Sequence, residues 1–274
     1  MARSKSRFKE RKDRKDKLGI FLIVVVLLCM LIGGGIILRN YFLQEKYDSL
    51  TFCPTDKSPS SLTIVLVDVT DTLNERQKTS IFNALEEIRD DVGKRGKLEV
   101  FLVKISEDKL LEPLFDHCNP GRGKDVSVVY GNPGLVEKRW KRGFSEPLTA
   151  IFKKIIPEGQ DTISPLMESI QSVALSSFDK PMYRNVPKKL FMISDMLQNT
   201  QGLSHYQGIP SFESFRKLPY YKKVRCNLSG TDVGVFYIRR DVRNEIQGRT
   251  HVEFWQGYFQ DQGARLTYIK PISG

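Results

Sequence analysis

Side chains that could bind a metal ion stand at the ends of three predicted elements of this sequence. All of them carry oxygen, and they are Asp68, Thr70, Thr72, Ser164 and Asp195. The first three occupy alternate positions in a loop after an apolar run, so their side chains can point the same way. Two carboxylates and three hydroxyls are the hard oxygen ligands that Mg²⁺ prefers. They predict a site for magnesium, or for another divalent cation such as Ca²⁺ or Mn²⁺, if the fold brings the three elements together.

The other reactive residues do not indicate catalysis. The three histidines are scattered, and no Cys/His cluster has the spacing of a zinc site. Neither a G-x-S-x-G nor a G-x-x-x-x-G-K-[ST] motif is present. An Asp after a first strand is also where haloacid dehalogenase-like phosphatases carry their nucleophile, but their second Asp is replaced here by Thr70. We therefore predict that the protein is not an enzyme, with a phosphatase-like hydrolase as the weaker alternative.

The elements that must position these residues alternate along residues 61–274. Apolar, β-branched runs predict six strands, over 62–70, 97–105, 110–118, 188–195, 232–240 and 265–272. Amphipathic stretches between them predict about six helices, the first of them capped by Asn74. The link before 110–118 is too short for a parallel crossover, so that strand is expected to be antiparallel at an edge. The pattern predicts a doubly wound α/β domain with a mostly parallel six-stranded sheet.

The carboxyl ends of parallel strands meet at one edge of such a sheet, which would gather the five oxygen-bearing residues. At this point the chain resembles the von Willebrand factor A family. That family builds its metal-ion-dependent adhesion site from D-x-[ST]-x-[ST], a separate Thr in a T-P-L-x-x-A-[IL] pattern, and an Asp that ends the fourth strand. The match is Asp68, Thr70 and Thr72 for the first motif, Ser164 for the separate Thr, and Asp195 for the last residue.

The resemblance extends over about residues 62–272, with three departures. Ser164 stands where Thr is usual, and Met196 follows Asp195 where the family commonly has Gly. Asp71 adds an acid that could raise the affinity for a cation or cap the next helix, and we expect the cap.

The family resemblance implies a binding module whose metal ion completes its coordination with an acidic side chain of a protein partner. Two alternatives stay open. The metal site can be a relic in which Asp68 and Asp195 are satisfied by backbone amides and hydroxyls. The protein can also be a structural subunit of a membrane-associated secretion, conjugation or defence complex, with a degenerate metal site.

The net charge of +11 is concentrated at the N-terminus. Residues 1–17 carry nine Lys or Arg against three acids, and residues 18–38 form an uncharged run of twenty-one residues. As a helix, that run would span about 31 Å, which matches a hydrocarbon core of roughly 30 Å. A cleaved signal peptide is the competing interpretation, but its apolar region is usually only about 7–15 residues long. The basic tail therefore indicates membrane topology, and we expect no binding to nucleic acid.

These features predict four segments: a basic cytoplasmic tail over 1–17, a transmembrane signal anchor over 18–38, a stalk over 39–60, and an extracytoplasmic domain over 61–274. Together with the family resemblance, the anchor suggests a bacterial inner-membrane protein whose domain lies in the periplasm.

Three of the four cysteines lie on the predicted extracytoplasmic side, where disulfides form. Cys53 precedes the first strand, and Cys118 ends the antiparallel strand, so both should lie at the edge of the sheet opposite the predicted metal site. We predict a Cys53–Cys118 disulfide, with Cys226 as the rival partner because it precedes the strand over 232–240.

Four basic residues, Lys138, Arg139, Lys141 and Arg142, gather in a predicted helix. They could form an anion-binding patch, although a solvated helix face is the simpler interpretation.

Limited proteolysis of right-side-out membrane vesicles tests the predicted orientation. Protease added outside should digest residues 39–274 and spare residues 1–17, because the Lys and Arg excess keeps the tail on the cytoplasmic side. Immunoblotting with antibodies against each end reads out the cleavage. Digestion of the tail with protection of the domain contradicts this topology.

Overall fold

The computed structural model describes residues 19–36, 38–39, 46–104, 110–128, 131–156, 163–240 and 245–272. The chain divides between Lys46 and Tyr47 into two units. The first unit contains the helix Gly19–Ile36, which has 18 residues and a mean hydropathy of 2.9. At a rise of about 1.5 Å per residue, such a helix is long enough to cross most of a bilayer's hydrocarbon core. This helix lies within the predicted span and fits a single-pass membrane protein.

The second unit is built on a six-stranded sheet. Its strands are β1 (Leu62–Val67), β2 (Lys97–Leu102), β3 (Phe115–Cys118), β4 (Lys188–Ser194), β5 (Thr231–Ile238) and β6 (Arg265–Ile272). Their order across the sheet is β3-β2-β1-β4-β5-β6. Every neighbouring pair is parallel except β2 and β3, which are antiparallel. The prediction of a mostly parallel sheet with one antiparallel edge strand is confirmed.

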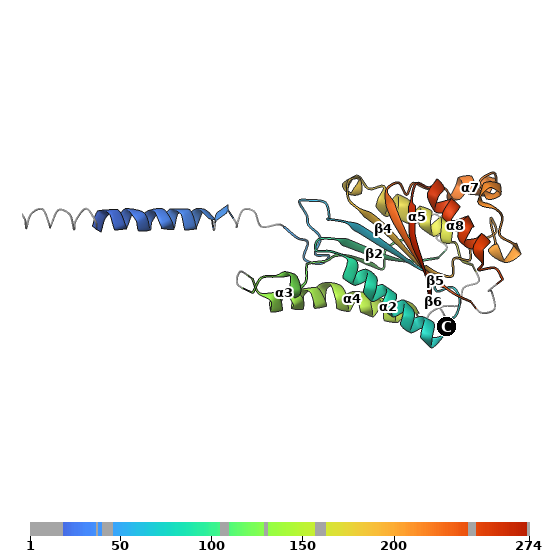
Figure 1. The fold of residues 1–274 in the computed structure, drawn as a ribbon, viewed down its shortest axis with the longest axis horizontal. Helices are drawn as coiled ribbons and strands as arrows, with labels where there is room; N and C mark the ends of the chain where they lie inside the picture. Colours follow the sequence, from blue (N-terminus) through green and yellow to red (C-terminus); the bar gives the residue numbers. More distant parts are fainter. Residues whose placement is uncertain are drawn as a thin grey trace, which may run out of the picture. The chain divides into compact units, whose positions relative to one another are not determined.

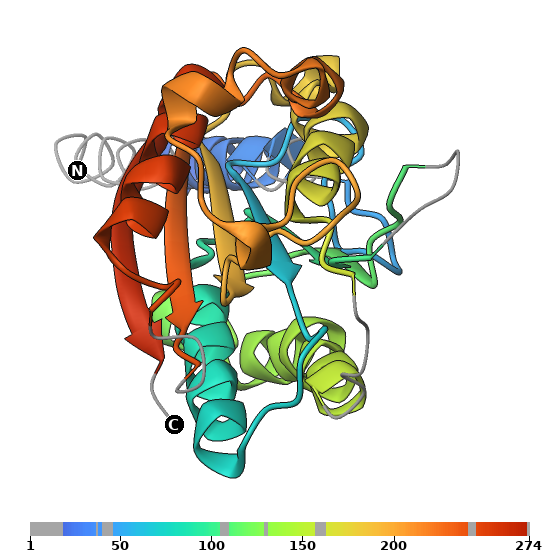
Figure 2. The same cartoon turned by 90° about the vertical axis from the view of Figure 1, so that its right-hand side faces the viewer.

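Helices cover both faces of the sheet (Figures 1 and 2). One face carries α2 (Glu75–Asp91), α3 (Pro133–Trp140) and α4 (Glu146–Ile155), and the other carries α5 (Leu166–Val173), α6 (Phe212–Phe215), α7 (Pro219–Val224) and α8 (Arg249–Asp261). Helix α2 begins at Asn74, as predicted. The Asn74 side chain accepts a hydrogen bond from the backbone N–H of Gln77, whose own side chain accepts one from the backbone N–H of Asn74. This reciprocal cap satisfies two backbone donors at the start of the helix.

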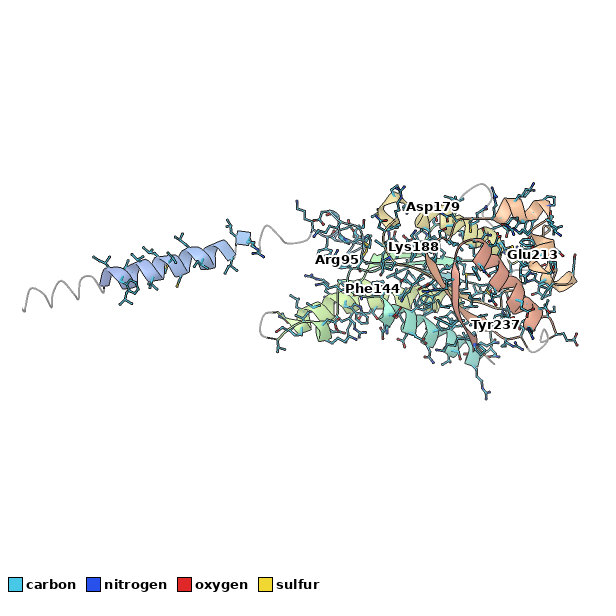
Figure 3. All side chains as sticks on the ribbon, turned by 45° about the horizontal axis from the view of Figure 1, so that its top comes forward. Arg95, Phe144, Asp179, Lys188, Glu213 and Tyr237 are labelled. Atoms are coloured by element: carbon cyan, nitrogen blue, oxygen red, sulfur yellow. A yellow bond between two sulfur atoms is a disulfide. The ribbon has the colours of Figure 1, made fainter. Side chains whose placement is uncertain are left out.

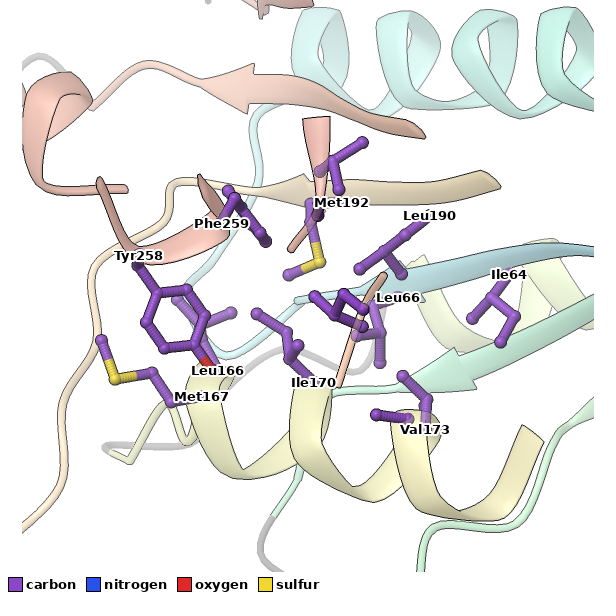
Figure 4. Packing of buried hydrophobic residues seen from close by; sticks show 14 of the residues in the cluster. Ile64, Leu66, Leu166, Met167, Ile170, Val173, Leu190, Met192, Tyr258 and Phe259 are labelled. Carbon is purple, nitrogen blue, oxygen red and sulfur yellow. The ribbon is translucent and has the colours of Figure 1, made fainter. Parts of the chain in front are cut away.

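Strand β1 is buried on both faces because nearly every one of its residues is apolar. Ile64 and Leu66 face a cluster that includes Leu166 and Ile170 of α5 and Phe259 of α8 (Figure 4). The intervening residues of β1 face the cluster beneath α2, α3 and α4. Two hydrophobic layers therefore cover the faces of the sheet, so a binding site on the sheet itself can lie only at its edges or at the ends of its strands.

Helix α3 continues into α4 through five π-helical residues, Lys141–Ser145. The backbone N–H of Glu146 donates to the carbonyl of Lys141, and Pro147, which has no N–H, follows in the first turn of α4. Helix α7 is short and begins at Pro219.

The predicted disulfide is confirmed: Cys53 and Cys118 are bonded, with 4.8 Å between their Cα atoms. The backbone N–H of Cys118 also donates to the carbonyl of Thr51 at 2.8 Å. These contacts attach the segment that precedes β1 to the end of β3. Cys226, the rival partner, is a free thiol.

Replacing both Cys53 and Cys118 by serine should lower the free energy of unfolding. The disulfide joins residues 65 positions apart, and closing a loop of that length stabilises by about 4 kcal/mol in the chain-entropy model. Urea unfolding of the detergent-solubilised full chain, followed by tryptophan fluorescence, measures the loss. Cys226→Ser is the matched control and should leave the urea midpoint unchanged. A double variant that is as stable as the wild type contradicts the prediction.

Candidate functional site

Three neighbouring parallel strands end at the same edge of the sheet, and their loops form the candidate site. Asp68 follows β1 directly, Asp195 follows β4 directly, and Arg240 comes two residues after β5. The backbone N–H of Asp68 donates to the carbonyl of Ile193 at 2.9 Å, which extends the pairing of β1 and β4 to this point. We call the loops that follow β1, β4 and β5 the rim.

Asp68 is 2% exposed, and both of its carboxylate oxygens accept hydrogen bonds. Oδ1 accepts from the backbone N–H of Thr70 at 3.1 Å and from its hydroxyl at 2.8 Å. Oδ2 accepts from the hydroxyls of Ser194 at 2.8 Å and Ser164 at 3.2 Å. The fold thus brings together three of the five predicted residues, Asp68, Thr70 and Ser164, through direct hydrogen bonds.

Asp195 is equally buried, at 3% exposed, and is paired with a cation from the chain itself. Its Oδ1 accepts from the backbone N–H of Leu197 at 3.0 Å, and its Oδ2 accepts from Arg240 Nε at 3.0 Å. The Arg240 guanidinium also donates through Nη1 to the carbonyl of Thr72 at 2.7 Å. A single guanidinium therefore connects the loops that follow β1, β4 and β5.

Thr72 and Asp71 surround the other side of this guanidinium. Thr72 is exposed, and it contacts Arg240 through its backbone carbonyl. Asp71 Oδ2 lies 3.9 Å from Arg240 Nε, with the Asp71 side chain 48% exposed. The extra acid at position 71 therefore adds negative charge beside Arg240.

Residues outside the predicted set complete the rim. Ser194 is one of them, and Gln247 is another, at 1% exposed. Gln247 Nε2 donates to the carbonyls of Asp195 at 3.0 Å and Ile238 at 2.8 Å, and its Oε1 accepts from the backbone N–H of Arg240 at 2.7 Å. The only sequence signal for Arg240 is that it ends the predicted strand over 232–240. Gln247 has no comparable signal because it follows no strand or motif.

Met196, at the position where the resemblance implies glycine, has a backbone conformation that favours glycine. Its φ of 61° lies in the left-handed region, which costs a residue with a side chain about 1–2 kcal/mol. Buried hydrogen bonds hold this conformation. The Met196 N–H donates to Ser194 Oγ at 2.7 Å, and its carbonyl accepts from Trp255 Nε1 at 2.8 Å and from His251 Nε2 at 2.9 Å.

His251 is fully buried beneath Met196. Its Nε2 lies 2.9 Å from the Met196 carbonyl and 3.1 Å from both Trp255 Nε1 and His205 Nδ1, and its Nδ1 lies 2.6 Å from the Tyr237 hydroxyl. Burial lowers the pKa of His251 to about 4. Burial and the neighbouring His251 lower the pKa of His205 to about 3. Both imidazoles are therefore neutral near pH 7 and support the rim as uncharged groups.

Burial raises the pKa of Asp195 to about 7, with the negative charge of Asp68 as a second cause and with Arg240 opposing both. The centre of the rim carries a formal charge of −1 only when both carboxylates are ionised, so the proton that Asp195 takes up near pH 7 neutralises it.

The described residues do not fit a magnesium ion in this arrangement. Arg240 and Leu197 occupy both oxygens of Asp195, and each oxygen of Asp68 accepts two hydrogen bonds. Among the described residues, no group of three or more His, Cys, Asp or Glu is placed to hold a metal ion. Magnesium binding stays a prediction, and this geometry favours the alternative in which the two carboxylates are satisfied by the chain itself.

No family model matches the chain, and no curated protein matches it. Three solved structures resemble the fold at low identity. The VWA domain of SpRpn10 has 8% identity and a TM-score of 0.39, over 78% of this chain and 88% of that one. An aerotolerance-related membrane protein from Bacteroides fragilis, with multiple mutations to serines, has 11% identity and a TM-score of 0.37, over 77% of this chain and 90% of that one. The conserved hypothetical protein BatB from Bacteroides thetaiotaomicron has 13% identity and a TM-score of 0.37, over 78% and 91%.

At these values the likenesses carry no functional argument. The strand order, with the antiparallel β3 at one edge, is that of a doubly wound α/β domain, as predicted.

The pKa of Asp195 predicts how stability depends on pH. Because the pKa in the folded state is about 7 and the usual value is 3.8, the proton on Asp195 stabilises the fold. This stabilisation is complete below about pH 4 and is lost as the pH rises through about 7. Each unit of pKa shift corresponds to about 1.4 kcal/mol of unfolding free energy. Relative to Asp195→Asn, the wild type should therefore lose several kcal/mol of unfolding free energy over that range.

Urea unfolding of both proteins at several pH values between about 4 and about 8 measures this difference. His205 and His251 are present in both proteins, so their own contributions to the pH dependence cancel. A difference that stays constant, or that grows in favour of the wild type as the pH rises, contradicts the raised pKa.

Proposed function

We propose that the protein is a membrane-anchored interaction module that binds a protein partner on its rim without a divalent cation. In this proposal Arg240 occupies the role that the metal ion has in the adhesion site. The observation that carries the proposal is the guanidinium that contacts Asp195, Thr72 and Asp71 together. A cation that belongs to the chain holds the three loops in place, so the rim needs no ion to complete it.

The rigidity of the adjoining loop supports a binding role. Gln198 is fully buried, and its Nε2 donates to Glu168 Oε2 and to the Tyr220 hydroxyl, both at 3.0 Å. Its Oε1 accepts from the backbone N–H of Met167 at 3.0 Å. The ring of Tyr220 covers Gly202, where any side chain would collide with it. A surface fixed before it binds loses less conformational entropy on association, which favours recognition of a folded partner.

The burial of the hydroxyls supports binding over turnover. Ser194 is 0% exposed and Ser164 is 6% exposed, and both donate to Asp68. A serine nucleophile must reach a substrate, and these two face inward. Within the described hydrogen bonds of Asp68 and Asp195, the partners are hydroxyls, amides and a guanidinium. That set lacks the imidazole or thiol that most nucleophilic mechanisms use.

The metal-dependent alternative makes a different prediction at the same place. If Mg²⁺ displaced Arg240 from Asp195, the partner would supply an acidic side chain to the ion, and chelation would abolish binding. With Arg240 retained, the half-exposed carboxylate of Asp71 is the accessible charge beside it, and this favours a partner with a basic side chain.

A photo-crosslinking amino acid at Thr72, in the full-length protein in native membranes, tests the proposal. Thr72 is exposed, so its replacement should leave the fold intact. We expect one protein adduct that persists in EDTA. Leu175, which is 53% exposed on the flank after α5, is the control position and should not give that adduct. An adduct that is lost in EDTA and restored by Mg²⁺ contradicts the metal-free proposal and supports the alternative.

Two substitutions of Arg240 show whether the guanidinium organises the rim. Arg240→Lys keeps the charge, but one ammonium cannot reproduce the planar fork that contacts Asp195 and Thr72 together, so the Thr72 adduct should be reduced. Arg240→Gln leaves Asp195 buried without its ion partner, at a cost of about 3–5 kcal/mol, and should abolish the adduct. Tryptophan fluorescence checks that each variant is folded. An undiminished adduct in folded Arg240→Gln would mean that the rim does not depend on this contact.

A further inference from the structure

The end of the domain opposite the rim carries basic side chains that the proposed function does not use. They lie in α3, in the π-helical turn and after α2, and they are Lys138, Arg139, Lys141, Arg142 and Lys94. All are exposed, and no ion pair to a carboxylate is described for any of them. Figure 3 shows Arg95, the neighbour of Lys94, at one end of the domain and Glu213 of α6 toward the other. We call this set the basic end.

Apolar side chains lie among these cations. Two adjacent hollows, of about 200 Å³ and about 460 Å³, share Phe52 and Arg139 in their walls. Tyr47 and Lys94 line the first, and Leu50 lines the second. Leu50 is 78% exposed, Val128 81% and Leu135 56%. Exposed apolar residues mixed with lysine and arginine are typical of surfaces that lie in the interface of an anionic membrane.

We propose that the basic end docks on a membrane surface containing anionic phospholipids. The inference rests on the membrane anchoring included in the proposed function. Tyr47 follows Arg39, the last described residue of the apolar segment, by eight residues, which span at most about 28 Å when fully extended. The chain therefore enters the domain among the residues of the basic end, and the anchor restricts this end to the vicinity of the membrane.

The distribution of the cations favours a membrane over a single phosphate group or a protein. All five side chains are exposed, and they are spread over α3, the π-helical turn and the residues after α2. A phosphate pocket requires several donors directed at one point, whereas the many negative headgroups of a lipid surface can pair with cations that lie apart from one another. The neighbouring apolar residues suit the boundary between headgroups and acyl chains.

A lipid-directed crosslink in nanodiscs tests this proposal on the full-length protein. A photo-crosslinking amino acid at Leu135 of α3 probes the basic end, and the same group at Leu218, between α6 and α7, is the control. Leu218 is 40% exposed, and α7 lies at the other end of the domain from α3 (Figure 1). Nanodiscs contain phosphatidylcholine alone or with about one third phosphatidylglycerol, and mass spectrometry measures lipid adducts on the protein.

We expect adducts at Leu135 that increase at least about fivefold with phosphatidylglycerol and fall as salt is raised from about 50 mM to about 500 mM. The charge reversal Lys138→Glu, Arg139→Glu and Arg142→Glu should remove this increase. The matched reversal of three exposed lysines in and just before α7, Lys217→Glu, Lys222→Glu and Lys223→Glu, should leave it unchanged. Leu218 should give no adduct in either lipid.

Three results would overturn docking on anionic lipid: equal adducts in both lipids, adducts that survive the charge reversal of the basic end, or equal adducts at Leu218. Competition by inorganic phosphate beyond that of chloride at matched ionic strength would instead indicate a phosphate pocket. Failure of the anchor is distinguishable, because the protein would then not copurify with the nanodiscs. Failure of the rim proposal is also distinguishable, because the crosslink at Thr72 is measured separately.

Discussion

The structure of the rim depends on the burial of two carboxylates at the ends of neighbouring strands. Asp68 and Asp195 are both almost inaccessible to water, and like charges at such a place repel each other. Hydroxyls compensate Asp68, and the Arg240 guanidinium compensates Asp195. Because an unpaired buried charge would cost several kcal/mol, the loops are constrained to bring these partners into contact.

An arginine attached to the chain differs physically from an exchangeable metal ion. It cannot dissociate, so under the proposed function the rim would be complete whenever the domain is folded and would not respond to the concentration of a divalent cation. Its planar fork also fixes the directions of its two contacts relative to each other, because Nε contacts Asp195 while Nη1 contacts the carbonyl of Thr72. The uncharged His251 and Trp255 beneath Met196 add to this rigidity by holding a left-handed residue directly after Asp195.

The two ends of the domain are organised by different chemistry. The rim is held by buried polar contacts, which require low exposure to be strong. The opposite end combines a covalent link, Cys53–Cys118, with exposed cations and apolar side chains. The disulfide attaches the segment that precedes β1 to the end of β3. The sheet between the two ends keeps them separate.

The sequence by itself determined the strands, the antiparallel β3 and the disulfide, because these follow from local patterns. Alternating and continuous apolar runs specify strands, and a link of a few residues excludes a parallel crossover. The strand directions then placed Cys53 beside Cys118, and they placed Asp68 and Asp195 at one edge. The edge of the sheet at which each of these residues lies was therefore predictable once the order of elements was known.

Only the tertiary structure decided which side chains satisfy those two carboxylates. Arg240 is 45 residues from Asp195 and 168 from Thr72, and no periodicity links positions so far apart. The roles of Ser194 and Gln247 also depend on which loops meet above the sheet. A motif identifies residues that could bind a metal ion, but the partner of a buried charge is selected by whichever group the packed loops bring within hydrogen-bond distance. For Asp195 that group is a guanidinium, and for Asp68 it is a set of hydroxyls.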